Sequence, residues 1–173
     1  MNRVDLSFAY LQKLPPGPVY ESVMKVLERE ILNVDEGTEF EKMVKQLEGM
    51  SPRKKLETVQ QWGCRAFLGM HQDTLLGFLA LQFHEHPRPV GVFRVYREKA
   101  YAHNGIGAKT VTAFINDCFS RPNYSRIEIS KGRREYQGTH DDVVEILKTI
   151  KETYQGPYRI TITPDTGLVE KLQ

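Results

Sequence analysis

The sequence has few cysteines, a single tryptophan and almost no net charge. Among its 173 residues are two cysteines, Cys64 and Cys118, which lie too far apart to form a metal-binding or redox motif. Cys118 falls on the apolar face of a helical pattern, where we expect a small core residue. This use of cysteine predicts a reduced, cytoplasmic setting, with no disulfide framework.

The sequence also lacks a broad excess of positive charge and a long apolar run. The formal net charge is only +2, so composition gives no general argument for nucleic-acid binding. The basic run KGRR (131–134) is short, and we interpret it as a solvated loop. No segment approaches the roughly 18 apolar residues of a membrane span, and the first residues have no apolar signal core. We therefore expect neither nucleic acid nor membrane as a partner.

The residues present predict one α+β domain over positions 1–173. Apolar residues make up 40% and charged residues 27%, both ordinary values for a globular protein. Expected strands cover 4–11, 64–86 as a hairpin turning at 72–74, 89–98, 124–130 and a last strand at 157–165. Expected helices cover 18–32, 38–50, 51–63, a segment following Gly107, and 139–156.

Two glycines stand at the entrance of the fourth expected helix. In REKAYAHNGIGAKTVTAFINDCF (97–119), Gly105 and Gly107 precede apolar residues that recur at helical spacing, and a Val- and Phe-rich strand (90–96) lies upstream. Glycines serve turns, but they also let a phosphate approach the unpaired amides at a helix N-terminus. Both interpretations, a turn and an anion site, are compatible with this segment alone.

Two common phosphate motifs fail at this turn. A P-loop would align Lys109 and Thr110, but His103 and Ala108 occupy its glycine positions. The dinucleotide fingerprint fits Gly105 and Gly107, yet Thr110 replaces its third glycine. That fingerprint also follows the first strand of a βαβ unit, whereas this turn follows an antiparallel meander.

A third motif fits better. The segment AHNGIG (102–107) resembles the [RQ]-x-x-G-x-[GA] signature of the GNAT-type N-acyltransferases, with Ala102 in place of the usual Arg or Gln. The expected order of elements is also similar to that superfamily along nearly the whole chain. The resemblance implies a GNAT-like fold, in which helices flank a mixed, mostly antiparallel sheet. It also implies that backbone amides of the turn bind the pyrophosphate of acetyl-CoA.

The resemblance assigns cofactor-binding positions one by one. They are Ala102, His103, Asn104, Gly105, Ile106, Gly107 and Ala108. Lys109, in the first turn of the helix, either supplies the charge lost at Ala102 or is an ordinary exposed lysine. Residues 93–96 would pair with pantetheine where the fourth and fifth strands separate, and an amide near Val95 would bind the thioester carbonyl.

The resemblance also implies acid–base chemistry, because an amine is mostly protonated at neutral pH. Glu85, at the end of the third strand, is the first candidate base and Glu98 the alternative; each is also compatible with a solvated carboxylate. The superfamily's tyrosine acid follows an N-x-x-A-x-x-x-Y pattern that is missing here. Tyr136, on an expected loop, is the nearest tyrosine, and water is the other candidate. His84 and His86 lack a third ligand, so no metal is expected.

These expectations define an enzyme and one rival. The enzyme is an N-acyltransferase that moves an acetyl or other acyl group from acyl-CoA to a primary amine, directly and in a ternary complex. Acetyl-CoA is its co-substrate. The rival is a catalytically inactive GNAT-like domain that binds CoA as a sensor or interaction module; Ala102 and the missing tyrosine pattern favour it. Acyl-CoA and an amine are the expected partners, and a homodimer is left open.

Overall fold

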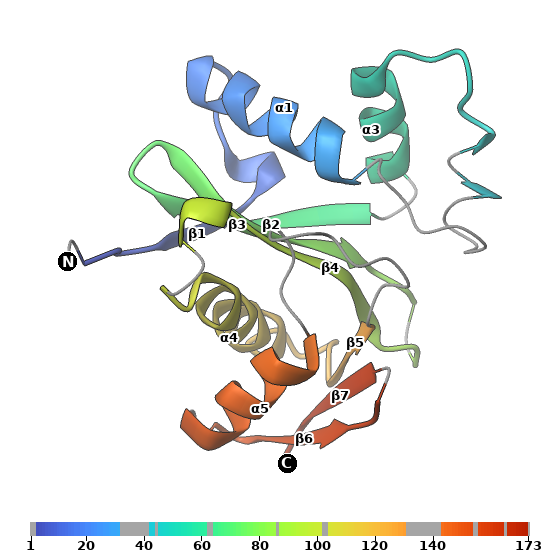
Figure 1. Cartoon of the computed structure of the whole chain (residues 1–173). Coiled ribbons are helices and arrows are strands. Elements are labelled where there is room, and N and C mark those ends of the chain that lie inside the picture. The colour runs from blue at the N-terminus through green and yellow to red at the C-terminus, as the bar shows by residue number, and fades with distance from the viewer. Residues whose placement is uncertain are drawn as a thin grey trace.

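A computed structural model of the chain shows a central sheet with helices on both faces (Figure 1). It describes residues 3–31, 42–43, 45–61, 64–85, 87–101, 104–130, 143–153, 156–164 and 166–172. Of the expected helix over 38–50, the structure describes 42–43 and 45–50: residues 42, 43 and 45 are helical, and 46–49 form a turn.

The described residues form one seven-stranded sheet of order β1-β2-β3-β4-β5-β7-β6. The strands are β1 (Ser7–Tyr10), β2 (Cys64–His71), β3 (Thr74–Gln82), β4 (Val90–Arg97), β5 (Arg126–Ser130), β6 (Tyr158–Ile162) and β7 (Thr166–Lys171). Only β4 and β5 pair in parallel. The mixed, mostly antiparallel sheet and the hairpin turn after His71 are confirmed.

Helices cover the two faces of this sheet in pairs. The helices α1 (Pro18–Ile31) and α3 (Pro52–Gln61) lie on one face, and α4 (Ile106–Phe119) and α5 (Val143–Thr153) on the other (Figure 1). Each pair encloses its own hydrophobic cluster against the sheet. Each helix therefore turns its apolar stripe toward the sheet.

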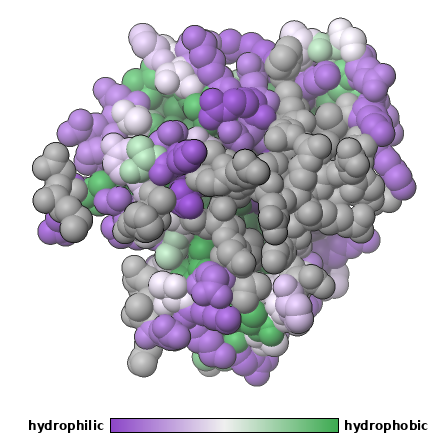
Figure 2. Space-filling view, viewed as in Figure 1, coloured by the Kyte–Doolittle hydropathy of each residue, from purple (hydrophilic) through white to green (hydrophobic). Residues whose placement is uncertain are grey.

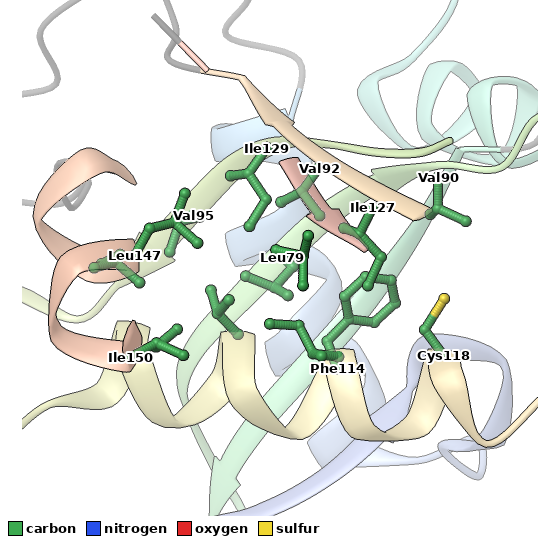
Figure 3. Packing of buried hydrophobic residues seen from close by; sticks show 14 of the residues in the cluster. Leu79, Val90, Val92, Val95, Phe114, Cys118, Ile127, Ile129, Leu147 and Ile150 are labelled. Carbon is green, nitrogen blue, oxygen red and sulfur yellow. The ribbon is translucent and has the colours of Figure 1, made fainter. Parts of the chain in front are cut away.

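The cluster beneath α4 contains the residues that the helical pattern placed inward. Phe114, Ile115 and Cys118 are buried and pack against β3, β4 and β5 (Figure 3). Burial raises the pKa of the Cys118 thiol to about 12. Cys118 is therefore a small, protonated core residue, as its place in the pattern predicts.

The third helix begins where its capping residues predict. Pro52 is its first residue, and the Lys54 N–H donates to the Ser51 side-chain oxygen at 3.2 Å. Ser51 therefore satisfies one of the unpaired amides at the helix start.

Replacing Ser51 with alanine should lower the free energy of unfolding by about 1 kcal/mol, because an exposed N-cap is lost. Thr58→Ala is the matched control, since the Thr58 hydroxyl bonds only the Lys54 carbonyl within the same helix. Urea denaturation of both variants measures the difference. If the Ser51→Ala protein were as stable as the Thr58→Ala protein, Ser51 would contribute nothing as a cap.

The end of the chain differs from its expectation, because 157–165 is not the last strand. A further strand, β7, returns antiparallel to β6 and inserts between β5 and β6. Gly167 lies under α5, where an added Cβ would come within 1.9 Å of Leu147 Cδ1. The strand was missed because a glycine occupies one of its inward positions, which weakens the alternating apolar pattern.

The described surface is predominantly hydrophilic. Figure 2 shows hydrophilic residues over most of the coloured surface on this face, with hydrophobic residues in small separate groups. Among the described residues, the large hydrophobic side chains that are exposed are Met50 and Leu172. None of the helices within the described ranges combines the length and apolarity that a bilayer crossing requires.

Candidate functional site

The glycine turn is the N-cap of α4. Gly105 has φ 67° and ψ 26°, the left-handed conformation that glycine adopts most easily. Its carbonyl accepts the Lys109 N–H at 3.0 Å, which closes the first helical turn. Glycine has no side-chain oxygen with which to cap the helix, so the first amides after it are left to bind an external acceptor.

The space beside this turn is open. A Cβ built on Gly105 would meet nothing within 4 Å, and Gly105 and Lys109 are exposed while Asn104 and Ala108 are half-buried. Open space, helix-start amides that no side chain of the N-cap residue accepts from, and the positive end of the helix dipole together form a suitable environment for an anion. Ala102 and His103, the other residues expected here, lie outside the described residues.

Two strand glycines hold this end of α4 close to the sheet. Gly69 of β2 and Gly77 of β3 pair directly across the hairpin. A Cβ on Gly77 would lie 2.7 Å from Ile106 Cγ2 and 2.9 Å from the Tyr96 carbonyl oxygen, while one on Gly69 would lie 2.9 Å from Thr110 Oγ1. The first turn of α4 therefore sits beside the end of β4. Sequence analysis missed this pair, although glycines within apolar strands indicate close packing.

Replacing Gly77 with alanine should lower stability by about 1–3 kcal/mol, because the added methyl group clashes with backbone and with α4. Gly91→Ala is the matched control. A Cβ there would meet only ordinary contacts, the nearest at 3.7 Å from the Gln82 carbonyl oxygen. Thermal unfolding compares the two. A Gly77→Ala protein as stable as Gly91→Ala would contradict the close approach of α4.

The strand β4 extends past the part of β5 that the structure describes. Among the described residues, β4 pairs with β5 from Val90 to Val92, and β4 continues to Arg97, whereas β5 is described as far as Ser130. A register shift in the β3–β4 ladder leaves Phe93 as an extra residue between Val92 and Arg94. Such a bulge bends a strand and increases its twist.

The register indicates where the backbone of β4 points beyond the bulge. The Glu98 N–H donates to the Leu76 carbonyl oxygen at 2.7 Å. Because residues of an antiparallel ladder alternate in direction, the main-chain groups of Val95 and Arg97 point away from β3, toward the side of β5. The Val95 side chain itself is buried between the sheet and α5 (Figure 3).

Glu98 lies at the same end of β4 and is held by a tyrosine. The Tyr96 hydroxyl donates to Glu98 Oε2 at 3.0 Å, and the Tyr96 ring stacks on Phe78 with centroids 5.0 Å apart. Burial, together with the hydrogen bond to Glu98, raises the pKa of Tyr96 to about 12. Tyr96 is therefore a neutral donor at physiological pH. Tyr96 was not among the residues predicted from the sequence, although the i, i+2 spacing places both side chains on one strand face.

Charged side chains of α1 surround this pair. Arg29 Nε donates to Glu30 Oε1 at 2.8 Å, and the buried Arg94 donates from Nη1 to the Glu30 carbonyl oxygen at 2.6 Å. The hydrogen bond to Glu30 raises the pKa of Arg29, and the charge of Glu98 raises it further. Glu98 thus faces a polar environment between β4 and α1.

The structure does not bring Glu85 to this site. Glu85 follows β3 and lines a cavity with His84 and with residues 122–125, which come after the end of α4. A helix of this length spans about 20 Å, so Glu85 lies at the opposite end of α4 from the glycine turn. Strand direction was the missed signal, because β3 ends where β4 begins.

Two further expected residues, Tyr136 and His86, lie outside the described residues. Within the part of the chain that the structure describes, no group of three His, Cys, Asp or Glu side chains could hold a metal ion. Three of the described candidates lie together. They are the first turn of α4, the main-chain groups of Val95 that point away from β3, and Glu98.

No family model matches this sequence, and no curated protein matches it at the sequence level. Solved structures do match along nearly the whole chain. Ard1 from Thermoplasma volcanium has a TM-score of 0.53 at 10% identity and covers 97% of this chain and 99% of its own. An acetyltransferase from Thermus thermophilus has a TM-score of 0.51 at 14% identity, with 98% and 97% covered.

A third similar structure is Escherichia coli ElaA, with a TM-score of 0.51, 10% identity, and coverage of 97% and 99%. Identities this low establish a common fold rather than a common activity. The strand order and the flanking helices of the described residues agree with the expected GNAT-like fold. The chain has the fold of the GNAT-type N-acyltransferases.

Proposed function

We propose that this protein is an N-acyltransferase that moves an acetyl group, or another acyl group, from acyl-CoA to a primary amine. The observation that carries the proposal is the glycine start of α4, which has no side-chain cap and lies beside the end of β4, where the Val95 backbone points away from β3. The turn offers amides to a pyrophosphate, and that side of β4 offers them to an extended chain.

In this proposal the first turn of α4 fixes the anionic end of the donor. Amides of Gly105, Ile106, Gly107 and Ala108 bind the pyrophosphate, whereas the Asn104 N–H already donates to the Tyr101 carbonyl oxygen at 3.1 Å. Lys109 adds charge from an exposed position in the same turn. Backbone amides and the helix dipole supply most of this binding, so Ala102 does not need to be an arginine.

The transfer itself needs a carbonyl partner and a base. The Val95 N–H binds the thioester oxygen and stabilises the negative charge that develops there. Glu98 accepts a proton from the ammonium form of the acceptor, whose nitrogen then attacks the thioester carbon. The C–N bond forms, the C–S bond breaks, and the second proton lost by the nitrogen passes through water to the departing CoA thiolate.

A thiol-release assay with acetyl-CoA and a panel of primary amines tests the activity. Release of free CoA that depends on both the amine and the protein is the expected result. Saturable binding of acetyl-CoA without release for any amine would instead support the CoA-binding sensor. Absence of binding would remove both.

A further inference from the structure

A second cavity lies at the end of α4 remote from the glycine turn. Its volume is about 490 Å³, within the size range of small-molecule sites. Segments from four parts of the chain meet there: the end of β1 with the 3-10 helix Leu11–Lys13, the start of β2, the residue after β3, and the segment after α4. The lining residues are Tyr10, Gln12, Lys13, Arg65, Phe83, Arg121 and Tyr124.

Aromatic rings form one wall of this second cavity. The Phe83 ring lies 6.5 Å from Tyr10 and 5.5 Å from Tyr124, centroid to centroid, and the Tyr124 contact is edge-on. All three side chains are only half-buried. Ring surface therefore remains available at the cavity, which suits stacking against a flat ligand.

The charged lining of the second cavity is entirely cationic. Arg65 donates from Nη1 to the carbonyl oxygens of Gln60 and Cys64, which leaves its charge uncompensated by these contacts. Lys13 is exposed and has no ion pair with any carboxylate of the described residues. Among the described residues that line the cavity, Lys13 and Arg65 therefore have no acidic neighbour, which favours an anionic ligand.

The third cation is fixed in place before any ligand arrives. Arg121 Nη2 lies 3.2 Å from Asp117 Oδ2, and its guanidinium stands 5.2 Å from the centre of the Tyr10 ring. The Tyr10 hydroxyl donates to the same Asp117 oxygen at 2.7 Å. These contacts orient the side chains of Arg121 and Tyr10. Ligand binding therefore costs little further side-chain entropy.

Hydrogen-bond donors cover the carbonyl groups at the end of α4, where the negative end of the helix dipole lies near the second cavity. Main-chain amides of Ser120 and Arg121 donate to carbonyls of the last helical turn, at 3.1 Å each to Asn116 and Cys118. Lys171 Nζ donates to the Phe119 carbonyl oxygen at 2.8 Å. These donors satisfy the terminal carbonyls, which reduces their repulsion of an anion.

We propose that the second cavity binds a phosphorylated aromatic molecule of mononucleotide size. Its phosphate lies against Lys13, Arg65 and Arg121, since guanidinium groups bind phosphate oxygens in pairs. Its ring lies on the aromatic wall beside Phe83 and Tyr124. This ligand is distinct from the acyl donor, which is proposed at the other end of α4.

Calorimetric titration with uridine 5′-monophosphate, with and without CoA, tests this proposal. Binding should persist when CoA is present and should exceed the binding of uridine and of inorganic phosphate. Lys13→Ala and Tyr124→Leu should each weaken it roughly tenfold, through a lost charged contact and a lost stacking surface. Lys25→Ala, which removes an exposed lysine of α1, is the matched control and should change nothing.

Several outcomes would overturn the proposal. Absence of binding would remove the site, and displacement of the nucleotide by CoA would place it in the proposed donor site instead. Uridine or phosphate alone binding equally well would refute the combined recognition of ring and phosphate. If CoA itself did not bind, the proposed acyltransferase function would be contradicted. The test of the nucleotide site would not be affected.

Discussion

Replacing Glu98 with glutamine is expected to lower the turnover number for acetyl transfer by roughly a hundredfold or more. Glutamine keeps an oxygen for the Tyr96 hydroxyl, which donates to Glu98 at 3.0 Å, but it cannot accept the proton of the amine. The loss should shrink as pH rises, because the pKa of a lysine-like amine is about 10.4 and more of it then arrives deprotonated. A pH–rate profile of both proteins measures this.

Glu85→Gln is the matched control, because it makes the same chemical change at the far end of α4. We expect its pH–rate profile to match that of the wild type, with stability changed by no more than about 0.5 kcal/mol at this exposed position. Equal profiles for Glu98→Gln and wild type would remove Glu98 from the mechanism. A selective loss in Glu85→Gln would contradict the placement of the site.

Replacing Gly107 with aspartate should weaken acetyl-CoA binding by well over tenfold. Gly107 is the second residue of α4, so the new carboxylate would stand where the pyrophosphate is proposed to bind. It would repel the ligand's charge and occupy the amides that should bind the ligand. Calorimetric titration with acetyl-CoA gives the affinity of each protein.

Two controls keep this result interpretable. Asn123→Asp adds the same charge at an exposed position beyond the far end of α4, and it should leave the affinity unchanged. Because Gly107 is buried, its variant must also be shown to unfold cooperatively, although aspartate suits the first turn of a helix. A folded Gly107→Asp protein with the affinity of the wild type would refute the pyrophosphate assignment.

Local signals in the sequence predicted most of the elements that the structure shows. Pro18 and Pro52 begin α1 and α3, and Gly105 precedes α4, each at its expected place. These positions were predictable because capping and proline geometry depend on only a few neighbouring residues. The open turn at Gly105 was predictable for the same reason.

Features that depend on pairing between strands were not predictable in this way. The extra residue at Phe93 exists only relative to the register of β3, so no pattern within β4 reveals it. The close approach at Gly77 likewise depends on where α4 crosses the sheet. The proposal of Glu98 in place of Glu85 depends on which end of the sheet faces the helix start, and that too is set by strand pairing.

Hydrogen–deuterium exchange with and without acetyl-CoA tests most directly whether the start of α4 and the side of β4 that points away from β3 form the donor site. We predict that acetyl-CoA slows exchange in peptides covering residues 104–109 and 93–97, because their amides become hydrogen-bonded to the ligand. Peptides covering residues 83–85 and 121–125 should not change. Binding that protects the latter peptides and leaves 104–109 unprotected would contradict the proposed site.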